Sequence, residues 1–312
     1  MSSEHAIVML HYVHRRDTRR DGVRPLWLDE FDTLLDGILE RADIVGPATF
    51  LERAIDRPNE GRPTVLLTFD DGTRDHYEIV APRLRERGLT GLFFVPTWPL
   101  DGRMPLAHAV HWALGEAPQQ TWEALLDEAA KAGVPVGTAD EAAQQYSYEE
   151  PGLRQRIKYA VNMRLPAEVA EVALRHAWEH AGYTERQLTS EWFVSEDELV
   201  ELARMGMHIG MHGESHKSLQ TLGPAGITAE IHGCAERLTR LLGKKPTWFA
   251  CPFGGHRAAA DVHASMNQAL VDVGVHAAVT TQRGTVTHMT HPLALPRFDV
   301  IEVPPRAGQW PW

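Results

Sequence analysis

The sequence predicts an α/β fold built on a parallel sheet or barrel that carries a helical insertion. Short continuous apolar runs of strand length recur along the chain, and helical patterns lie between them. Strands that are buried on both faces have such continuous runs, and alternation of strand and helix is typical of parallel sheets. A length of 312 residues suits one barrel-type domain with an insertion.

Six apolar runs are predicted to form strands of this sheet. Gly, Pro or a cluster of polar residues bounds each run, and these residues end regular structure. The runs are residues 6–10, 65–69, 91–95, 208–211, 247–251 and 276–280.

Two helices of the barrel have ends that are visible in the sequence. Ser195 and Glu198 form a capping box, in which each side chain binds the other residue's backbone N–H, and the helix is predicted to end at Gly206. A second apolar stripe begins near Pro224 and ends at Gly243. Proline in the first turn and glycine after the last turn is the usual order.

Two regions break the alternation. Residues from about 105 to 190 are rich in Ala, Glu and Gln and show helical patterns with little strand character. Because barrel-like elements bracket this region, we interpret it as a helical insertion between two barrel strands, within a single domain of residues 1–312. The Pro-rich tail "PPRAGQWPW" is predicted to be a packing arm rather than a recognition motif.

The composition excludes several classes of protein. Asp and Glu outnumber Lys and Arg by 42 to 31, and the net charge of −11 would repel nucleic acid and anionic membranes. Two cysteines are too few for a disulfide framework and suit a reducing compartment. There is no signal-peptide core and no run of about 18 apolar residues. We therefore expect a cytoplasmic protein without a membrane span.

The first candidate site residues are Asp70 and Asp71, which follow the run at 65–69 and precede Gly72. Successive side chains at a strand end point in different directions, so one carboxylate can bind a metal ion while the other faces a substrate water. The alternative is a strand-end turn, in which an aspartate binds the local backbone and the glycine supplies a positive φ angle. Taken alone, the "DDG" motif is more typical of this turn.

The second candidate is the pair His212 and His216, which has the H-x3-H spacing that can bring two imidazoles onto one ion. Such a pair is as often only a polar surface. A carboxylate from another strand end changes this balance, because two histidines and one carboxylate leave coordination positions open for water and substrate. The combination is typical of a catalytic metal site.

The third candidate is the turn "FACPFGG", which follows the run at 247–251. Backbone N–H groups near Phe253 or Gly254 could face a developing oxyanion, because glycine allows the backbone to approach a ligand closely. A plain tight turn is an equally good interpretation of this segment by itself.

In this order and separation, "TFDDG", H-x3-H after "IG", and "PFG" resemble the first three motifs of the polysaccharide deacetylase family, also called carbohydrate esterase family 4 or the NodB homology domain. The resemblance covers about residues 6–100 and 192–303 and is thin in the helical insertion. The segment "GLFFVPTWPLDGRMPLAHAVHWALG" resembles a subgroup found among surface-polysaccharide biosynthesis genes.

The resemblance implies a distorted (β/α)7 barrel that removes N-acetyl groups from amino sugars with one divalent metal ion, commonly Zn²⁺. It implies that Asp70 is the general base and that the metal ligands are Asp71, His212 and His216. The chemistry of the residues agrees, because a dication beside one carboxylate makes the adjacent pair tolerable. The oxyanion would rest on the metal and on the N–H of Phe253 or Gly254.

The chain departs from the family pattern at the third motif. Family members often carry an arginine there that holds the catalytic aspartate, but this chain has Ala250. Arg297, in "LPRFD", is our candidate to replace it from the last strand, with Asp299 orienting the guanidinium. The alternative is an ordinary surface ion pair.

The family's general acid, a histidine in a late Leu-x-His motif, has no clean copy in this chain. His288 and His291 lie in the corresponding region, and His256 follows the third motif. We prefer His11 as the general acid, because it ends the first strand and the carboxyl ends of barrel strands face the active site. Each of these histidines could instead be structural.

The function that follows is hydrolysis of an N-acyl group, in the first place N-acetyl, on an amino sugar used in surface-glycan or sugar-precursor synthesis. A cytoplasmic enzyme would act on a nucleotide-linked, lipid-linked or free sugar. One alternative on the same fold is a deformylase or cyclic-amide hydrolase. The other is an inactive carbohydrate-binding protein, which the missing arginine and late histidine motif would explain.

Overall fold

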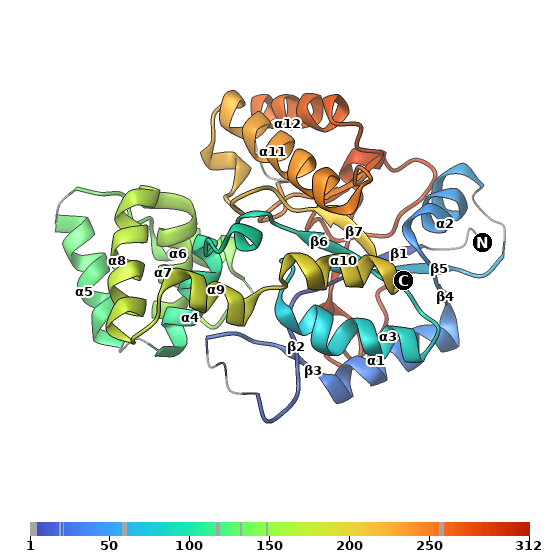
Figure 1. The fold of residues 1–312 in the computed structure, drawn as a ribbon, viewed down its shortest axis with the longest axis horizontal. Helices are drawn as coiled ribbons and strands as arrows, with labels where there is room; N and C mark the ends of the chain where they lie inside the picture. Colours follow the sequence, from blue (N-terminus) through green and yellow to red (C-terminus); the bar gives the residue numbers. More distant parts are fainter. Residues whose placement is uncertain are drawn as a thin grey trace.

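The computed structural model describes residues 5–18, 20, 22–57, 61–116, 119–131, 133–147, 149–255 and 259–312. A curled sheet of short strands forms its centre (Figure 1). The strands are β1 Ala6–Leu10, β2 Val13–His14, β3 Leu26–Trp27, β4 Asp43–Ile44, β5 Thr64–Phe69, β6 Leu92–Val95, β7 His208–Met211, β8 Trp248–Ala250, β9 Ala277–Val279 and β10 Phe298–Asp299.

The main sheet is parallel and curls toward closure. Its strand order is β10-β1-β5-β6-β7-β8-β9, and β4 pairs with β5 beside this path. Every pairing is parallel, for example Val8 with Phe298 and Phe93 with Ile209. At the open side, Val279 of β9 forms a bridge with Leu295, which precedes β10. The predicted distorted (β/α)7 barrel is confirmed.

All six predicted strands are present, and two of them have the expected bounds. The runs at 6–10 and 208–211 became β1 and β7 without change, whereas the other four shifted by one residue at one or both ends. The two-residue strands β2, β3 and β4 were not predicted, whereas β10 lies where the last strand was expected, in "LPRFD". Pairing over two residues is set by neighbouring elements rather than by a local pattern, so no periodicity marks it.

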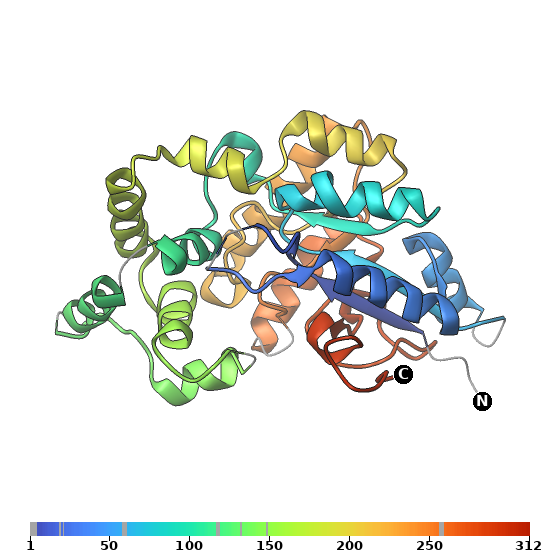
Figure 2. The ribbon, with the colours of Figure 1, turned by 90° about the horizontal axis from the view of Figure 1, so that it is seen from below.

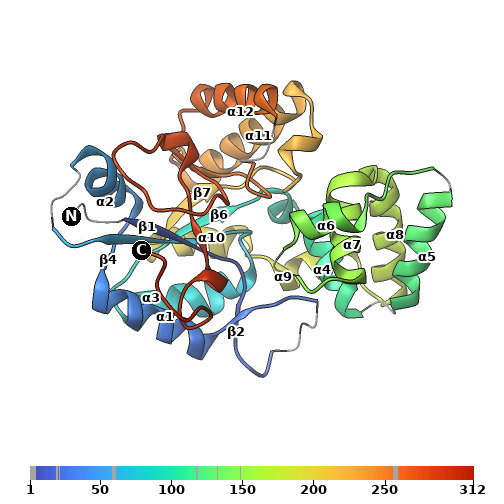
Figure 3. The ribbon, with the colours of Figure 1, turned by 180° about the vertical axis from the view of Figure 1, so that it is seen from behind.

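Helices surround the sheet (Figures 1 and 3). They are α1 Leu28–Arg41, α2 Pro47–Leu51, α3 Ala81–Glu86, α10 Glu196–Arg204, α11 Pro224–Leu242 and α12 Ala260–Asp272. The predicted capping box is present, because Ser195 accepts a hydrogen bond from Glu198 N and Glu198 accepts one from Ser195 N. The last turn of α11 ends at Gly243, whose φ of 69° is left-handed, as the proline and glycine pattern predicts.

The region at 105–190 is helical, as predicted, and lies to one side of the barrel (Figure 2). Its helices are α4 Leu106–Glu116, α5 Gln119–Lys131, α6 Ala139–Gln145, α7 Leu153–Tyr159, α8 Ala167–His180 and α9 Glu185–Trp192. They bury a hydrophobic cluster of their own, which includes Trp122, Leu174 and Trp178 and is separate from the cluster under the sheet. The chain leaves the barrel after β6 and returns before α10.

The C-terminal tail packs on the barrel, as predicted. The Trp310 ring lies so close to α1 that a Cβ on Gly37 would be 2.8 Å from it. The ring centroids of Trp312 and Phe298 are 5.3 Å apart. In the part of the chain that the structure describes, no helix combines the length and apolarity that crossing a bilayer requires.

Candidate functional site

The carboxyl ends of the strands bring the candidate residues together. Asp70 and Asp71 follow β5, and His212 follows β7. Arg297 immediately precedes β10, which pairs with β1. In parallel barrels these ends share one face, which is where catalytic side chains collect. The sequence separation of more than 200 residues is therefore no obstacle to a common site.

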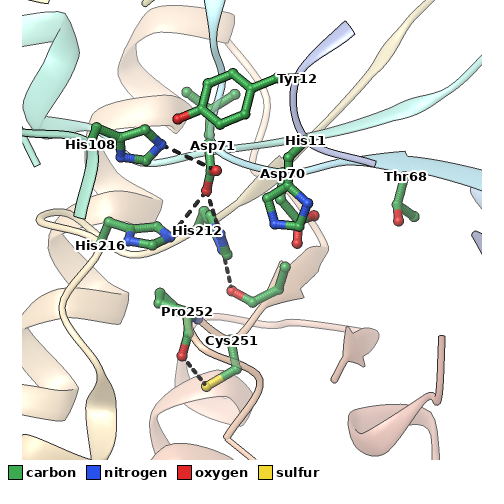
Figure 4. Close-up of polar contacts among 12 residues, drawn as sticks. His11, Tyr12, Thr68, Asp70, Asp71, His108, His212, His216, Cys251 and Pro252 are labelled. Carbon is green, nitrogen blue, oxygen red and sulfur yellow. Dashed lines mark hydrogen bonds and ion pairs between the residues drawn. The ribbon is translucent and has the colours of Figure 1, made fainter. Parts of the chain in front are cut away.

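Asp71, His212 and His216 form a buried cluster (Figure 4). The Nε2 atoms of His212 and His216 lie 3.3 and 3.1 Å from Asp71 Oδ1. Each residue offers one ligand atom, and these atoms all lie within 4.8 Å of one another. Two histidines and one carboxylate with this spacing suit a divalent cation with open coordination positions.

The hydrogen bonds around the cluster also fit a cation. His212 Nδ1 donates to the Ala250 carbonyl oxygen at 2.8 Å, which leaves the lone pair of Nε2 directed at the cluster. Asp71 Oδ1 is buried and accepts no hydrogen bond of good geometry from the described residues. A buried carboxylate oxygen in this condition is costly unless a cation binds it. The residues present therefore fit the ion that the family resemblance implies.

Charges and burial set the protonation states of two of the candidate ligands, Asp71 and His216. Burial opposes ionisation of Asp71, but the neighbouring His108 and His216 outweigh it and hold the pKa of Asp71 well below its usual value. Burial, only partly offset by Asp71, lowers the pKa of His216 to about 4. Near neutral pH the carboxylate is ionised and the His216 imidazole is neutral, and these are the forms that bind metals.

Backbone strain also concentrates at this site. Three non-glycine residues among those described have a left-handed φ: Asp71 at 82°, His216 at 59° and Phe253 at 58°. This conformation costs about 1 to 3 kcal/mol for a residue with a Cβ, and it persists only where the surrounding structure enforces it. That all three residues line one pocket is an independent sign of a functional site.

Arg297 forms a two-point ion pair with Asp70. Its Nη1 and Nη2 each lie 2.8 Å from one carboxylate oxygen of Asp70. The alternative of a surface ion pair is wrong, because the arginine is only 1% exposed. Nε donates to Thr280 O at 2.9 Å and Nη1 also reaches Thr68 Oγ1 at 3.2 Å. These contacts orient the guanidinium.

Asp299 does not have the orienting role that the sequence suggested. Its carboxylate accepts a hydrogen bond from Ile301 N and caps the short helical turn that follows β10. This hydrogen bond occupies the Asp299 carboxylate locally, and Arg297 is oriented instead by Thr280 O and Thr68 Oγ1.

The ion pair fixes the charge of Asp70. Burial raises the pKa of this carboxyl, but the charges of Arg297 and His212 outweigh burial, so the pKa lies below its usual value. Asp70 is therefore a carboxylate at neutral pH, which is the form a general base must have. The Arg297 guanidinium thus supplies the positive charge beside Asp70 that Ala250 cannot supply.

The candidate general acids separate by location. His11 lines the same pocket as the aspartates, and its ring lies beside Asp70 (Figure 4). His288 and His291 are exposed, and His291 accepts a hydrogen bond from Leu293 N. His256 lies outside the described residues. Geometry thus favours His11 among the candidates that the structure describes.

The turn after β8 presents Phe253 toward the cluster. Its ring centroid lies 5.2 Å from that of His216. Gly254 N donates to Cys251 O at 2.8 Å, so the turn itself uses this N–H. Two backbone N–H groups were suggested as donors to an oxyanion. Because the N–H of Gly254 is already used, the N–H of Phe253 is the remaining candidate.

Replacing Gly254 with alanine is expected to lower the free energy of unfolding by about 1 to 3 kcal/mol more than the same change at Gly206. The φ angles match, at 87° and 89°, so the conformational cost is shared. A Cβ at Gly254 would lie 1.9 Å from Thr281 Oγ1, whereas one at Gly206 meets nothing within 4 Å. Denaturant unfolding of both variants measures the difference; equal losses would refute the close approach.

Two site residues of the insertion were not identified from the sequence. His108 Nε2 lies 3.2 Å from Asp71 Oδ2. His111, one helical turn further along α4, binds the Tyr12 hydroxyl through Nδ1 at 3.1 Å. The residues lie in an apolar helix of the insertion, where histidines have no signature. Only the segment "PLAHAVHWALG" within the resemblance marked this region.

A pocket of about 660 Å³ joins the cluster to the insertion. The aspartates and His212 lie on its barrel side, and Arg24, Glu149 and Lys158 lie on the side of the insertion and the N-terminal loop. The insertion therefore contributes part of the wall of the candidate active site.

The fold and the site define a parallel barrel with a candidate mononuclear metal site at the carboxyl ends of its strands. The sequence model described as "Polysaccharide deacetylase" matches residues 172–277. This range contains the second and third motifs and both cluster histidines, but not Asp70 or Asp71. No curated protein matches the chain.

Solved deacetylases share the fold over almost the entire chain. The Streptococcus pyogenes deacetylase PplD in complex with acetate is 16% identical, covering 96% of this chain and 93% of its own with a TM-score of 0.59. IcaB from Ammonifex degensii is 15% identical over 96% and 92%, with a TM-score of 0.58. A de-N-acetylase from Aggregatibacter actinomycetemcomitans is 13% identical over 95% of both chains, with a TM-score of 0.55. The resemblance to the polysaccharide deacetylase family is thus borne out by the family model over residues 172–277, which include the second and third motifs.

Proposed function

We propose that this protein is a metal-dependent hydrolase that removes an N-acetyl group from an amino sugar during synthesis of a surface glycan or its precursor. The single observation that carries the proposal is that two adjacent carboxylates with different partners lie in one pocket. Asp71 faces the histidines, and Asp70 is held as a carboxylate by Arg297. Two adjacent carboxylates with separate partners are the arrangement that a metal ligand and a general base require.

The residues that would hold the ion are Asp71, His212 and His216, and we expect Zn²⁺ because the donor set of two imidazoles and one carboxylate suits it. When bound, such an ion would polarise the amide carbonyl and lower the pKa of a water. We place the reaction in the cytoplasm, in accordance with the expectation from composition.

Residues of the chain would transfer the protons and stabilise the developing negative charge. Asp70 would accept a proton from the attacking water, and Arg297 would keep its two oxygens oriented toward the pocket. The backbone N–H of Phe253 would donate to the oxyanion. His11, beside Asp70 in the same pocket, would return a proton to the departing amine.

The proposal is tested by the metal content and acetate release of the wild-type protein and of His212→Ala. Wild type is expected to bind close to one equivalent of zinc and the variant at least fivefold less, because one of three protein ligands is missing. His276→Ala is the matched control, since His276 is exposed and lies outside the pocket. Formate release from N-formyl sugars is followed on the same samples.

The outcomes separate the candidate functions. Acetate release by wild type and by His276→Ala, but not by His212→Ala, supports a metal-dependent deacetylase. Formate release alone would support the deformylase instead. Stoichiometric metal without any turnover on a broad panel of N-acyl sugars would favour an inactive carbohydrate-binding protein, and absence of metal after reconstitution would refute the proposed site.

A further inference from the structure

A basic cluster forms the outer wall of the pocket, on the side opposite the barrel strands. It consists of Arg24 from the N-terminal loop with Arg154 and Lys158 from α7, all arranged around Glu149. Glu149 and Lys158 are buried, at 5% and 4% exposure. We call these four residues the outer basic cluster. All four line the pocket that contains Asp70 and Asp71.

The single carboxylate of this cluster is shared among three cations. Lys158 Nζ lies 2.7 Å from Glu149 Oε1, and Arg24 and Arg154 each lie 3.3 Å from Oε2. Oε2 has no hydrogen bond of good geometry from the described residues. Arg154 Nε donates instead to Oε1 at 3.4 Å. Two guanidinium groups therefore lie near Oε2 without a hydrogen bond of good geometry to it.

The cluster carries an excess of two positive charges, because three cations face one carboxylate. This excess is unusual in a chain with a net charge of −11. Lys158 is buried, whereas the Arg24 and Arg154 side chains are 50% and 25% exposed and can meet a ligand. A positive wall in a low-dielectric pocket attracts anionic ligands.

A continuous series of contacts links the cluster to the metal-site residues. The Arg154 guanidinium donates to Gly22 O, and a Cβ on Gly22 would lie 1.5 Å from the His111 carbonyl oxygen. The His111 and His108 ring centroids are 5.8 Å apart, and His108 Nε2 lies 3.2 Å from Asp71 Oδ2. Because both ends also line one pocket, one ligand that fills it can meet both.

The electrostatics of His111 support this connection. Burial and then the charge of Lys158 lower the pKa of His111 well below its usual value, while Asp71 acts in the opposite direction. His111 is thus within electrostatic range of both the outer cluster and the metal-site carboxylate. Charges from both sites therefore act on the same histidine.

We propose that the outer basic cluster binds a phosphate group of the substrate, so that the amino sugar enters the pocket as a sugar phosphate or sugar diphosphate. This inference rests on the proposed function and narrows its substrate class. A diphosphate diester carries two negative charges, which match the two excess positive charges of the outer basic cluster. A single carboxylate would neutralise only one of these charges. Arginine forks bind phosphate oxygens in pairs, and a lysine adds a compact charge.

Binding of inorganic pyrophosphate tests the cluster independently of turnover. Metal-loaded wild type and Arg24→Gln are titrated by calorimetry, and the variant is expected to raise the Kd about tenfold, because one charge-assisted contact is lost. Arg24 is the residue to change because its side chain is 50% exposed, so its replacement leaves no cavity in the core. Arg204→Gln is the control, with the same charge change at a side chain that is 73% exposed and outside the pocket. An equal Kd for both variants would overturn the proposal.

A comparison of substrates then identifies the chemical group that the outer basic cluster recognises. N-acetylglucosamine 1-phosphate, UDP-N-acetylglucosamine and a short-chain prenyl diphosphate sugar are compared with neutral N-acetylglucosamine and with N-acetylmuramic acid. At least tenfold higher kcat/KM for the phosphate-bearing sugars, reduced by Arg24→Gln and not by Arg204→Gln, supports the proposal. Equal rates on neutral sugars, or a preference for the carboxylate, would refute it. Failure of the deacetylase itself would abolish every rate and leave the pyrophosphate result intact, so the two failures are distinguishable.

Discussion

Replacing Asp70 with asparagine is expected to reduce acetate release by about 10³- to 10⁴-fold while the metal content stays at the wild-type level. A positioned general base contributes about 10²- to 10⁴-fold, and the amide cannot accept a proton. The metal is expected to remain, because Asp70 faces Arg297 rather than the histidine cluster. Steady-state kinetics and metal analysis on the same preparation give both quantities.

The loss at Asp70 has to be distinguished from a loss of folding. The asparagine would leave Arg297 buried without its counter-charge, so the variant's stability is measured alongside its activity. Asp299→Asn is the matched control, since Asp299 lines the same pocket but caps the turn after β10. We expect it to keep most of the activity. Full activity in a folded, metal-loaded Asp70→Asn variant would show that another group is the base.

The sequence predicted the barrel because its signals are local. Strands buried on both faces need continuous apolar runs, and those runs mark β1, β5, β6, β7, β8 and β9. The candidate metal ligands were equally visible, because Asp71 and His212 lie within two residues of such runs and His216 follows His212 at H-x3-H spacing. In a parallel barrel the carboxyl ends of the strands share one face, so the barrel itself brings these residues together.

Other features of the site could not be predicted, because they depend on tertiary contacts between residues that are far apart in the sequence. His108 reaches Asp71 only after the insertion has folded back over the pocket, and no spacing in the sequence encodes that approach. The outer basic cluster joins Arg24 to Glu149 across more than 100 residues. Likewise, Arg297 could be suggested from its place near the last strand, but its burial and its two contacts to Asp70 required the structure.

Replacing Arg297 with methionine is expected to lower the free energy of unfolding by about 3 to 5 kcal/mol, because it leaves the buried Asp70 carboxylate without a partner. It also removes the guanidinium that keeps the pKa of Asp70 low. Burial then dominates and raises that pKa, so the acid limb of the kcat/KM profile is expected to move to higher pH. Denaturant unfolding and a pH–rate profile measure the two effects.

A double variant separates the structural role of Arg297 from its role in tuning Asp70. Asp70→Asn combined with Arg297→Met removes both charges, so most of the stability lost in either single variant is expected to return, while activity stays at the level of Asp70→Asn. Arg297→Lys is expected to restore part of the low pKa but not the two-point geometry, because an ammonium group is a single point charge. If stability did not recover in the double variant, the buried pair would not be the source of the loss. If the acid limb of Arg297→Met coincided with that of wild type, Arg297 would stabilise the barrel without tuning the base.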